Sequence, residues 1–304
     1  MRVLVTGAAG YLGTDLVDRL ASHPAVTDIV AYDNLSRGNY AFFLAPGRSS
    51  EKVRFVQGEL LDTRTLAHNL EGVEVVFHLA ARVTTPFADR DAHLFEQVNH
   101  WGTAELTYAV EQSNSVRRLV YLSSAAVYGT SDEAVGVGSA THPVTVYGVS
   151  KLRGEGHVRR LSPSVAAYVI RCGNVYGYSR SLRFDSVLNR FMFDARYQHR
   201  ITIHGTGEQK RPFVHVRDVS QVLVRLLNTD LEPGDFDLVT RTMSVNEAAD
   251  AVAYLYPKVE RLYVNQDLRL RELNVAADDR LTSLIEEPRS LETELGEFRT
   301  AFTY

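Results

Sequence analysis

The chain has 304 residues, 45% of them hydrophobic, which is enough for one large or two modest hydrophobic cores. Its net charge of −4 predicts no nucleic-acid partner, and the lack of any run of about 18 apolar residues predicts neither a membrane span nor a membrane partner. A single cysteine, Cys172, excludes an intramolecular disulfide; with no signal peptide visible before the first strand, a cytoplasmic location is expected.

The first fourteen residues predict a nucleotide-binding turn. An apolar run at residues 3–5 indicates a buried parallel strand, and a helical pattern opens at Leu12. Between them, Gly7, Gly10 and Gly13 follow the spacing G-x-x-G-x-x-G. These glycines permit a tight turn and let the backbone approach a pyrophosphate at the helix N-terminus. Because the triplet follows a strand and opens a helix, it favours dinucleotide binding over an ordinary strand–helix turn.

The second predicted strand, residues 28–32, leads into Asp33. An acidic residue about twenty positions past such glycines binds the adenosine ribose hydroxyls and repels a 2′-phosphate. This favours NAD as the cofactor over NADP. Arg37 offers a partner for a 2′-phosphate, so NADP is kept as the minor alternative.

Strands and helices alternate through the following segments. Predicted strands cover residues 53–57, 73–79, 116–123 and 165–171, and predicted helices cover residues 63–70, 104–113 and 147–161. This order is typical of βαβ units and predicts an α/β fold with a doubly wound, mostly parallel sheet of the Rossmann type. Functional residues of such sheets gather at the carboxyl ends of the strands.

The pattern loosens after Asn174, which indicates a smaller C-terminal substrate domain. An arginine-rich loop at 178–185 precedes a helix at 186–197, a strand at 200–204 and a turn at 205–207. A strand at 213–216 and a helix at 219–227 are expected to return to the first domain, before a last helix at 244–256. We therefore expect an NAD-binding domain of residues 1–173 plus about 213–240 and a substrate domain of about 174–212 plus 241–304.

Three residues predict the chemistry. Tyr147 and Lys151 stand four positions apart in a predicted helix, so their side chains share one face. A nearby cation lowers a tyrosine pKa, and a phenolate near neutral pH can take a proton from a sugar hydroxyl. Ser124, 23 residues before Tyr147, can hydrogen-bond the oxygen that becomes a carbonyl. Hydride chemistry needs all three; a surface ion pair and a turn cap are the ordinary alternatives.

The chain resembles the extended short-chain dehydrogenases/reductases, in the NAD-dependent sugar-nucleotide epimerase/dehydratase family, over residues 1 to about 240. The nearest type is the 4-epimerases of UDP-hexoses. The resemblance is carried by these motifs: T-G-A-A-G-Y-L-G at 6–13, D-N-L-S-R-G at 33–38, H-L-A-A at 78–81, N-H-W-G-T at 99–103, S-S-A-A-V-Y-G at 123–129, Y-G-V-S-K at 147–151, R-C-G-N-V-Y-G at 171–177 and R-P-F-V-H-V-R-D-V at 211–219.

The resemblance implies two sets of site residues beside the catalytic Ser124, Tyr147 and Lys151. Cofactor binding falls to Gly7, Gly10, Tyr11, Leu12, Gly13, Asp33, Asn34, Glu59, Leu60, Leu79, Ala80, Ala81, Asn99, Tyr147 and Lys151. Substrate binding falls to Arg82, Ser124, Asn174, His204, Arg211 and Arg271. Ordinary alternatives remain for Arg211, as a structural ion-pair partner, and for His204, as an exposed strand residue. Asp62 is a rival to Glu59 for the adenine contact, and Arg269 is an alternative to Arg271 for a second diphosphate contact.

The resemblance also implies the partners: a nucleotide-sugar substrate, with a bias to UDP, and a second copy in a homodimer through the helices near residues 100–113 and 147–161. No metal is expected, because His157 and His215 show no metal-ligand companions at useful spacing.

One departure from the family bears on the reaction. The 4,6-dehydratases of the family commonly carry acidic residues directly after the catalytic Ser/Thr, where this chain has Ala125 and Ala126. Alanine can neither eliminate water nor take a proton. The sequence therefore favours an NAD-dependent 4-epimerase acting on a UDP-hexose. A sugar-nucleotide 4-ketoreductase or a different dehydratase stays open, as does a non-enzymatic NAD(H)-binding sensor.

Overall fold

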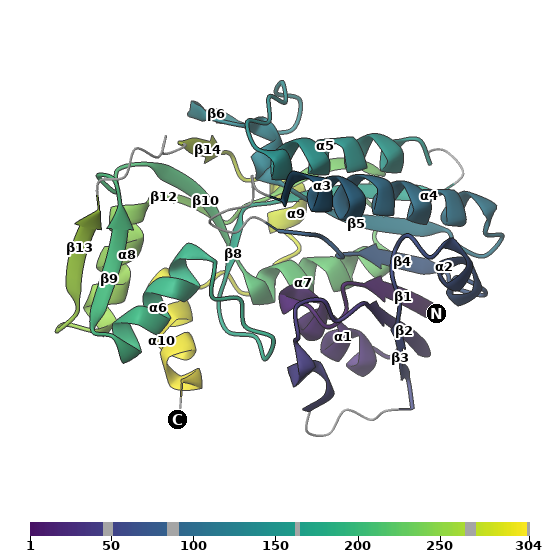
Figure 1. The fold of residues 1–304 in the computed structure, drawn as a ribbon, viewed down its shortest axis with the longest axis horizontal. Coiled ribbons are helices and arrows are strands. Elements are labelled where there is room, and N and C mark those ends of the chain that lie inside the picture. The colour runs from purple at the N-terminus through teal and green to yellow at the C-terminus, as the bar shows by residue number, and fades with distance from the viewer. Residues whose placement is uncertain (45–50, 84–90, 162–164, 265–271, 303–304) are drawn as a thin grey trace.

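The computed structural model describes residues 1–44, 51–83, 91–161, 165–264 and 272–302, and its centre is a parallel sheet (Figure 1). Every neighbouring pair in this sheet is parallel. In spatial order its seven strands are β11 (Gly234–Leu238), β7 (Ala166–Cys172), β5 (Arg118–Ser124), β4 (Val75–His78), β1 (Arg2–Thr6), β2 (Asp28–Asp33) and β3 (Val53–Gln57). The predicted Rossmann-type fold is confirmed.

Alternating side chains of each strand explain why helices cover both faces of the sheet. Val3 and Val5 pack in one core with helices α1 (Tyr11–Ser22) and α7 (Val216–Arg225). Leu4, between them in sequence, lies in the opposite core, which is closed by α2 (Thr63–Asn69), α4 (Gly102–Gln112) and α5 (Val146–Arg159). Figure 1 shows α4 and α5 on one side of the sheet and α1 and α7 on the other.

The remaining elements form a second group with a core of its own, centred on Phe191, Ile203 and Phe213. In this group, β10 pairs with β8 and β12, and β9 pairs with β13; a further pair, β14 and β6, lies beside it. The strands are β6 (Ser131–Val135), β8 (Asn174–Tyr176), β9 (Arg200–His204), β10 (Lys210–His215), β12 (Arg241–Ser244), β13 (Glu260–Val264) and β14 (Leu273–Val275). The helices are α6 (Val187–Tyr197), α8 (Val245–Leu255) and α10 (Leu291–Ala301). The short helix α9 (Asp279–Thr282) instead packs against β11, and its Leu281 lies in the core of the central sheet.

Several of these elements differ from the sequence expectation. The helix predicted at 104–113 begins earlier, because α3 (Ala92–Phe95) and a π-helical segment, η3 (Glu96–Trp101), run directly into α4. The strand predicted at 213–216 is β10, which joins the second group rather than the central sheet. Short 3-10 segments lie at η1 (Tyr40–Leu44), η4 (Ala125–Tyr128) and η5 (Leu226–Asn228). None of the helices among the described residues has both the length and the apolar character needed to cross a bilayer.

The order of the strands determines where a site can form. The chain winds outward from β1 toward β3 on one side and from β4 toward β11 on the other, so the winding reverses between β1 and β4. Ligands of doubly wound sheets bind at such a reversal, outside the carboxyl ends of the strands. Here those two strand ends lead into Gly7 and Leu79.

Candidate active site

A cavity of about 1680 Å³ opens at the carboxyl ends of the central strands and extends to α6 and β9. Of the residues predicted to bind cofactor or substrate, all but two line it. Asn99 lies outside the lining, and Arg271 lies outside the described residues. The structure thus brings the predicted site residues together; their individual roles stay predictions.

The glycine turn at the inner end of the cavity leaves no room for side chains. Gly7 has a φ of +70°, and a Cβ there would lie 2.6 Å from the backbone nitrogen of Ala80. A Cβ on Gly13 would overlap the carbonyl oxygen of Gly7. Helix α1 begins at Tyr11 with Gly10 as its N-cap and no side-chain cap, so backbone N–H groups at the helix start are available to an anion. This bare turn fits the pyrophosphate of a dinucleotide.

Asp33 is held in place by the backbone at the end of β2. Its two carboxylate oxygens accept hydrogen bonds from the Leu35 N–H at 2.7 Å and the Ala9 N–H at 3.0 Å. Burial raises the pKa of Asp33, and these two bonds oppose that rise. Next to it, the Asn34 amide donates to both oxygens of Glu59, at 3.1 and 3.0 Å. The carboxylates expected at the adenosine end are therefore preorganised.

Asn99 acts behind the cavity wall. Its Oδ1 accepts from the Arg82 N–H at 2.7 Å, and its Nδ2 donates to the Arg82 carbonyl at 2.9 Å and to Ser150 Oγ at 3.0 Å. Asn99 is fully buried within η3. It thus fixes the backbone that follows β4, and the structure gives it a supporting position rather than one in the cavity lining.

The three catalytic candidates come from two elements that meet at the cavity. Ser124 ends β5, and its Oγ accepts from the Ala126 N–H at 3.2 Å. Tyr147 and Lys151 lie on α5, which starts there because Thr145 caps it through a 2.8 Å bond from the Gly148 N–H. The Ser124 side chain also lowers the pKa of the Tyr147 hydroxyl. The serine and the tyrosine therefore flank one point in the cavity.

The predicted electrostatic effect of Lys151 on Tyr147 is wrong for this structure. Burial raises the pKa of Tyr147, and the effects that lower it come from the Ser124 hydrogen bond and the Arg183 charge. Lys151 instead donates to the Leu122 carbonyl at 2.6 Å and lies over the Tyr121 ring. Burial lowers the pKa of Lys151 itself to about 7, because a charged ammonium is costly in an apolar setting.

Arg183 is a residue that the sequence analysis did not single out. It lies in the arginine-rich loop at 178–185, lines the cavity, and its charge acts on both Tyr147 and Tyr11. The richness of that loop in arginine was the available signal. In the substrate half, the Asn174 amide donates to the Pro212 carbonyl at 3.0 Å, Arg211 is half-buried, and His204 is exposed at the end of β9.

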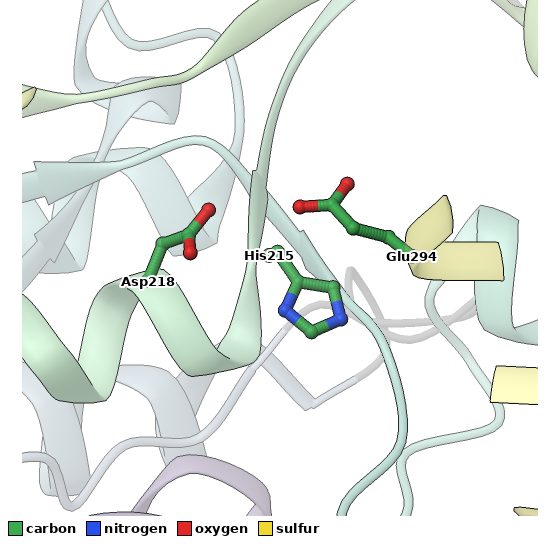
Figure 2. A group of neighbouring side chains, drawn as sticks. All are labelled: His215, Asp218 and Glu294. Carbon is green, nitrogen blue, oxygen red and sulfur yellow. The ribbon is translucent and has the colours of Figure 1, made fainter. Parts of the chain in front are cut away.

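His215 has companions that its sequence neighbours did not reveal. Figure 2 shows Asp218 and Glu294 beside it, and one ligand-type atom from each lies within 4.8 Å of the others. The expectation that His215 lacks such companions is therefore wrong, because α10 brings Glu294 from the far end of the chain. Arg289 donates to His215 Nδ1 at 3.2 Å, and Arg241 pairs with Glu294 at 3.0 Å. The positive charges of these guanidinium groups can balance the two carboxylates without a metal ion; that no metal binds stays a prediction.

The bare glycine turn, the acidic strand end and the Ser–Tyr–Lys group around one cavity define a dinucleotide-binding enzyme of the short-chain dehydrogenase/reductase type. The chain belongs to the NAD dependent epimerase/dehydratase family, whose model matches residues 3–238. The predicted family is thereby confirmed, and the predicted cofactor, NAD, is confirmed at the level of the family.

Relatives within this family carry different names. A dTDP-D-glucose 4,6-dehydratase of Mus musculus is 29% identical over 77% of this chain and 66% of its own length, slightly less than two thirds of that enzyme. An uncharacterized UDP-glucose epimerase, YtcB of Bacillus subtilis, is 29% identical over 83% of this chain and 78% of that protein. The structure of MoeE5 in complex with UDP-glucose and NAD is similar with a TM-score of 0.85 and 26% identity, covering 99% of this chain and 98% of that one.

Proposed function

We propose that this protein is an NAD-dependent sugar-nucleotide epimerase that inverts C4 of a UDP-hexose through a 4-keto intermediate. The observation that carries the proposal is the meeting of Ser124, Tyr147 and Lys151 at a cavity in which Ala125 and Ala126 follow the serine. The name of the Bacillus subtilis relative and the UDP-glucose bound to MoeE5 support the reaction and the nucleotide.

The cofactor half of the cavity suits NAD. The pyrophosphate would bind the N–H groups at the start of α1, where Gly7, Gly10 and Gly13 leave the backbone bare. The hydroxyls of the adenosine ribose would bind the fixed carboxylate of Asp33. NAD held there would supply the hydride acceptor that oxidation at C4 requires, and NADH the hydride donor for the reverse transfer.

Tyr147 and Ser124 act on the C4 oxygen of the sugar. The Tyr147 phenolate oxygen takes the proton of the C4 hydroxyl, and the Ser124 hydroxyl donates a hydrogen bond to the oxygen as it becomes a carbonyl. Because burial opposes ionisation of Tyr147, the hydrogen bond from Ser124 and the charge of Arg183 stabilise the phenolate that the step requires. After the 4-keto sugar has turned about its diphosphate link, Tyr147 gives its proton back.

The outer half of the cavity holds the rest of the substrate. Arg211 would pair with the diphosphate through a charge-assisted contact, and Asn174 would donate to it. His204, exposed at the end of β9, would stack on the base. Arg271 and its alternative Arg269 lie outside the described residues and stay predictions for a second diphosphate contact.

Dehydration is the alternative that the mouse relative's name keeps open. It needs an acid and a base near C5 and C6 of the sugar. Among the described residues, the carboxylates that line the cavity are on other segments: Asp33, Glu59, Asp185 and Asp194. The segment next to Ser124 supplies only the methyl groups of Ala125 and Ala126, which favours epimerisation.

Proton NMR tests the proposal directly. The purified protein would be mixed with UDP-glucose, UDP-galactose, their N-acetyl forms or the matching uronic acids, without added cofactor. We expect one C4 pair to interconvert with no net consumption of NAD. A 4-keto-6-deoxy product would instead establish a dehydratase, and a product formed only with stoichiometric NADH or NADPH would establish a reductase. An inert panel, even with NAD added, would contradict epimerisation of these sugars.

We also propose a homodimer built on the outer surfaces of α4 and α5. Two large aromatic side chains are exposed along this region, Trp101 at 54% and Tyr108 at 46%. Light scattering coupled to gel filtration should give twice the chain mass, and Trp101→Glu should convert the dimer to a monomer. Tyr254→Phe, at an exposed position on α8, is the control that should leave the mass unchanged. A monomeric wild-type protein would contradict the proposal.

A further inference from the structure

The outer wall of the cavity is formed by one face of α6 and the strand β9. Val187, Phe191 and Asp194 line the cavity at helical spacing, and Arg200 and Thr202 face it from β9. If C4 of the sugar lies at Tyr147 and the diphosphate at Arg211, the nucleoside of the substrate must extend to this wall. The polar groups of this wall are therefore those that can select the nucleoside.

Asp194 has an unsatisfied oxygen in this wall. The residue is 5% exposed, and its Oδ2 accepts a hydrogen bond from Arg190 Nε, one helical turn earlier, at 2.7 Å. Its Oδ1 is buried and finds no hydrogen-bond partner among the described residues. A buried carboxylate oxygen without a donor is costly, so the position is expected to be completed by a donor from outside the protein.

Gln209 presents a second acceptor of the same kind. It also lines the cavity, and its Nε2 donates to the carbonyl of His204 at 3.2 Å. This bond orients the amide, and its Oε1 is then buried without a hydrogen-bond partner in the described part of the chain. Two unsatisfied acceptors in the outer half of one cavity call for a ligand with neutral N–H or O–H donors.

We propose that Asp194 is a specificity-determining residue that accepts a hydrogen bond from the nucleoside of the substrate, with Gln209 as a second acceptor. The inference rests on the proposed function and names what the outer subsite recognises. A uridine nucleotide offers three donors of the required kind: N3–H of the base and the 2′- and 3′-hydroxyls of the ribose. A site built to hydrogen-bond such a donor rejects an analogue that lacks it, because its own acceptor is left unpaired.

Calorimetric titration separates the three donors without relying on turnover. NAD-loaded protein would be titrated with UDP, 3-methyl-UDP, 2′-deoxy-UDP and 3′-deoxy-UDP. We expect the wild-type protein to bind at least one analogue about tenfold more weakly than UDP. In Asp194→Ala, UDP and that analogue should bind equally, because the acceptor that distinguished them is gone. Asp194→Asn, which keeps the shape of the side chain, should reduce the preference and serves if the alanine variant does not fold.

Arg190→Gln is the matched control for a merely structural role. It removes the ion-pair partner of Asp194 but keeps the carboxylate, so the preference for UDP should persist. Asp194 would have no contact with the nucleoside if it only pairs with Arg190 or if water satisfies its Oδ1. In that case the Asp194 variants will keep the wild-type preference among the four nucleotides. This result would contradict the inference and leave UDP binding itself unaffected. If the wild-type protein binds no UDP, the proposed substrate class itself is wrong.

Discussion

The two halves of the cavity are built by different means. In the cofactor half, backbone geometry dictates the residues: Gly7 has a positive φ, Gly13 has no space for a Cβ, and two backbone N–H groups hold Asp33. In the substrate half, long side chains such as Arg183 and Arg211 reach in from loops and strand ends. A site fixed by the backbone can be recognised in a sequence from its residue types. A site fixed by side chains depends on packing between distant segments.

Tyr147 lies where the two halves meet, and its loss should have the largest effect. Tyr147→Phe removes the group that carries the C4 proton, so we expect turnover to fall roughly 10²- to 10⁴-fold in the NMR assay. NAD content, measured by absorbance after denaturing the purified protein, should be unchanged, because the cofactor turn is not altered. Tyr254→Phe is the control: Tyr254 is exposed on α8, so this variant should keep wild-type turnover. Near-normal turnover of Tyr147→Phe would overturn the mechanism.

Gly13→Ala probes the backbone-built half alone. The new Cβ would overlap the Gly7 carbonyl oxygen, which rigid backbone cannot avoid, so the turn must distort and lose its anion-binding N–H groups. We expect NAD affinity to fall by about tenfold or more, measured by calorimetry on cofactor-stripped protein. Gly156→Ala on α5 is the matched control, since a Cβ there meets nothing within 4 Å. Equal NAD affinity in the two variants would show that the turn tolerates a side chain.

Lys151 lines the cavity one helical turn from Tyr147, and its lowered pKa predicts that the stability of the protein depends on pH. Burial lowers that pKa from 10.5 to about 7. Between these values the unfolded chain binds the extra proton, so this group makes the unfolding free energy rise with pH, by at most about 1.4 kcal/mol per pH unit. Lys151→Met lacks this contribution. The unfolding free energy of the wild type minus that of the variant, both from urea unfolding of NAD-free protein, should therefore increase from pH 7 to pH 10. Parallel plots of unfolding free energy against pH for the two proteins would contradict this prediction.

The same contrast explains what could be predicted from the sequence. The central strands, the glycine turn and the Ser–Tyr–Lys group follow from local patterns, and the cavity contains them. The neighbours of His215 could not be predicted, because Glu294 reaches it only through the packing of α10. The Tyr147 pKa was predicted in the wrong direction, because helical spacing shows which charges are near but not how much water is excluded. Arg183 was missed for a different reason: it lies in a loop without periodicity, so the sequence does not show that its side chain reaches the cavity.

The smallest expected effect concerns a contact between the halves. Arg37, in the cofactor loop, lies 3.9 Å from Asp185 in the substrate loop, and this pairing occupies the cation that could otherwise bind the 2′-phosphate of NADP. Asp185→Asn removes the negative charge that pairs with Arg37 and so frees the Arg37 guanidinium for the 2′-phosphate of NADP. Because the pair is partly exposed and worth at most about 1 kcal/mol, NADP affinity should rise no more than roughly fivefold, with NAD affinity unchanged. Arg37→Ala combined with Asp185→Asn should abolish the gain. Equal improvement for NAD and NADP in calorimetry would mean that Asp185 acts on the fold of its loop and not on the charge that selects the cofactor.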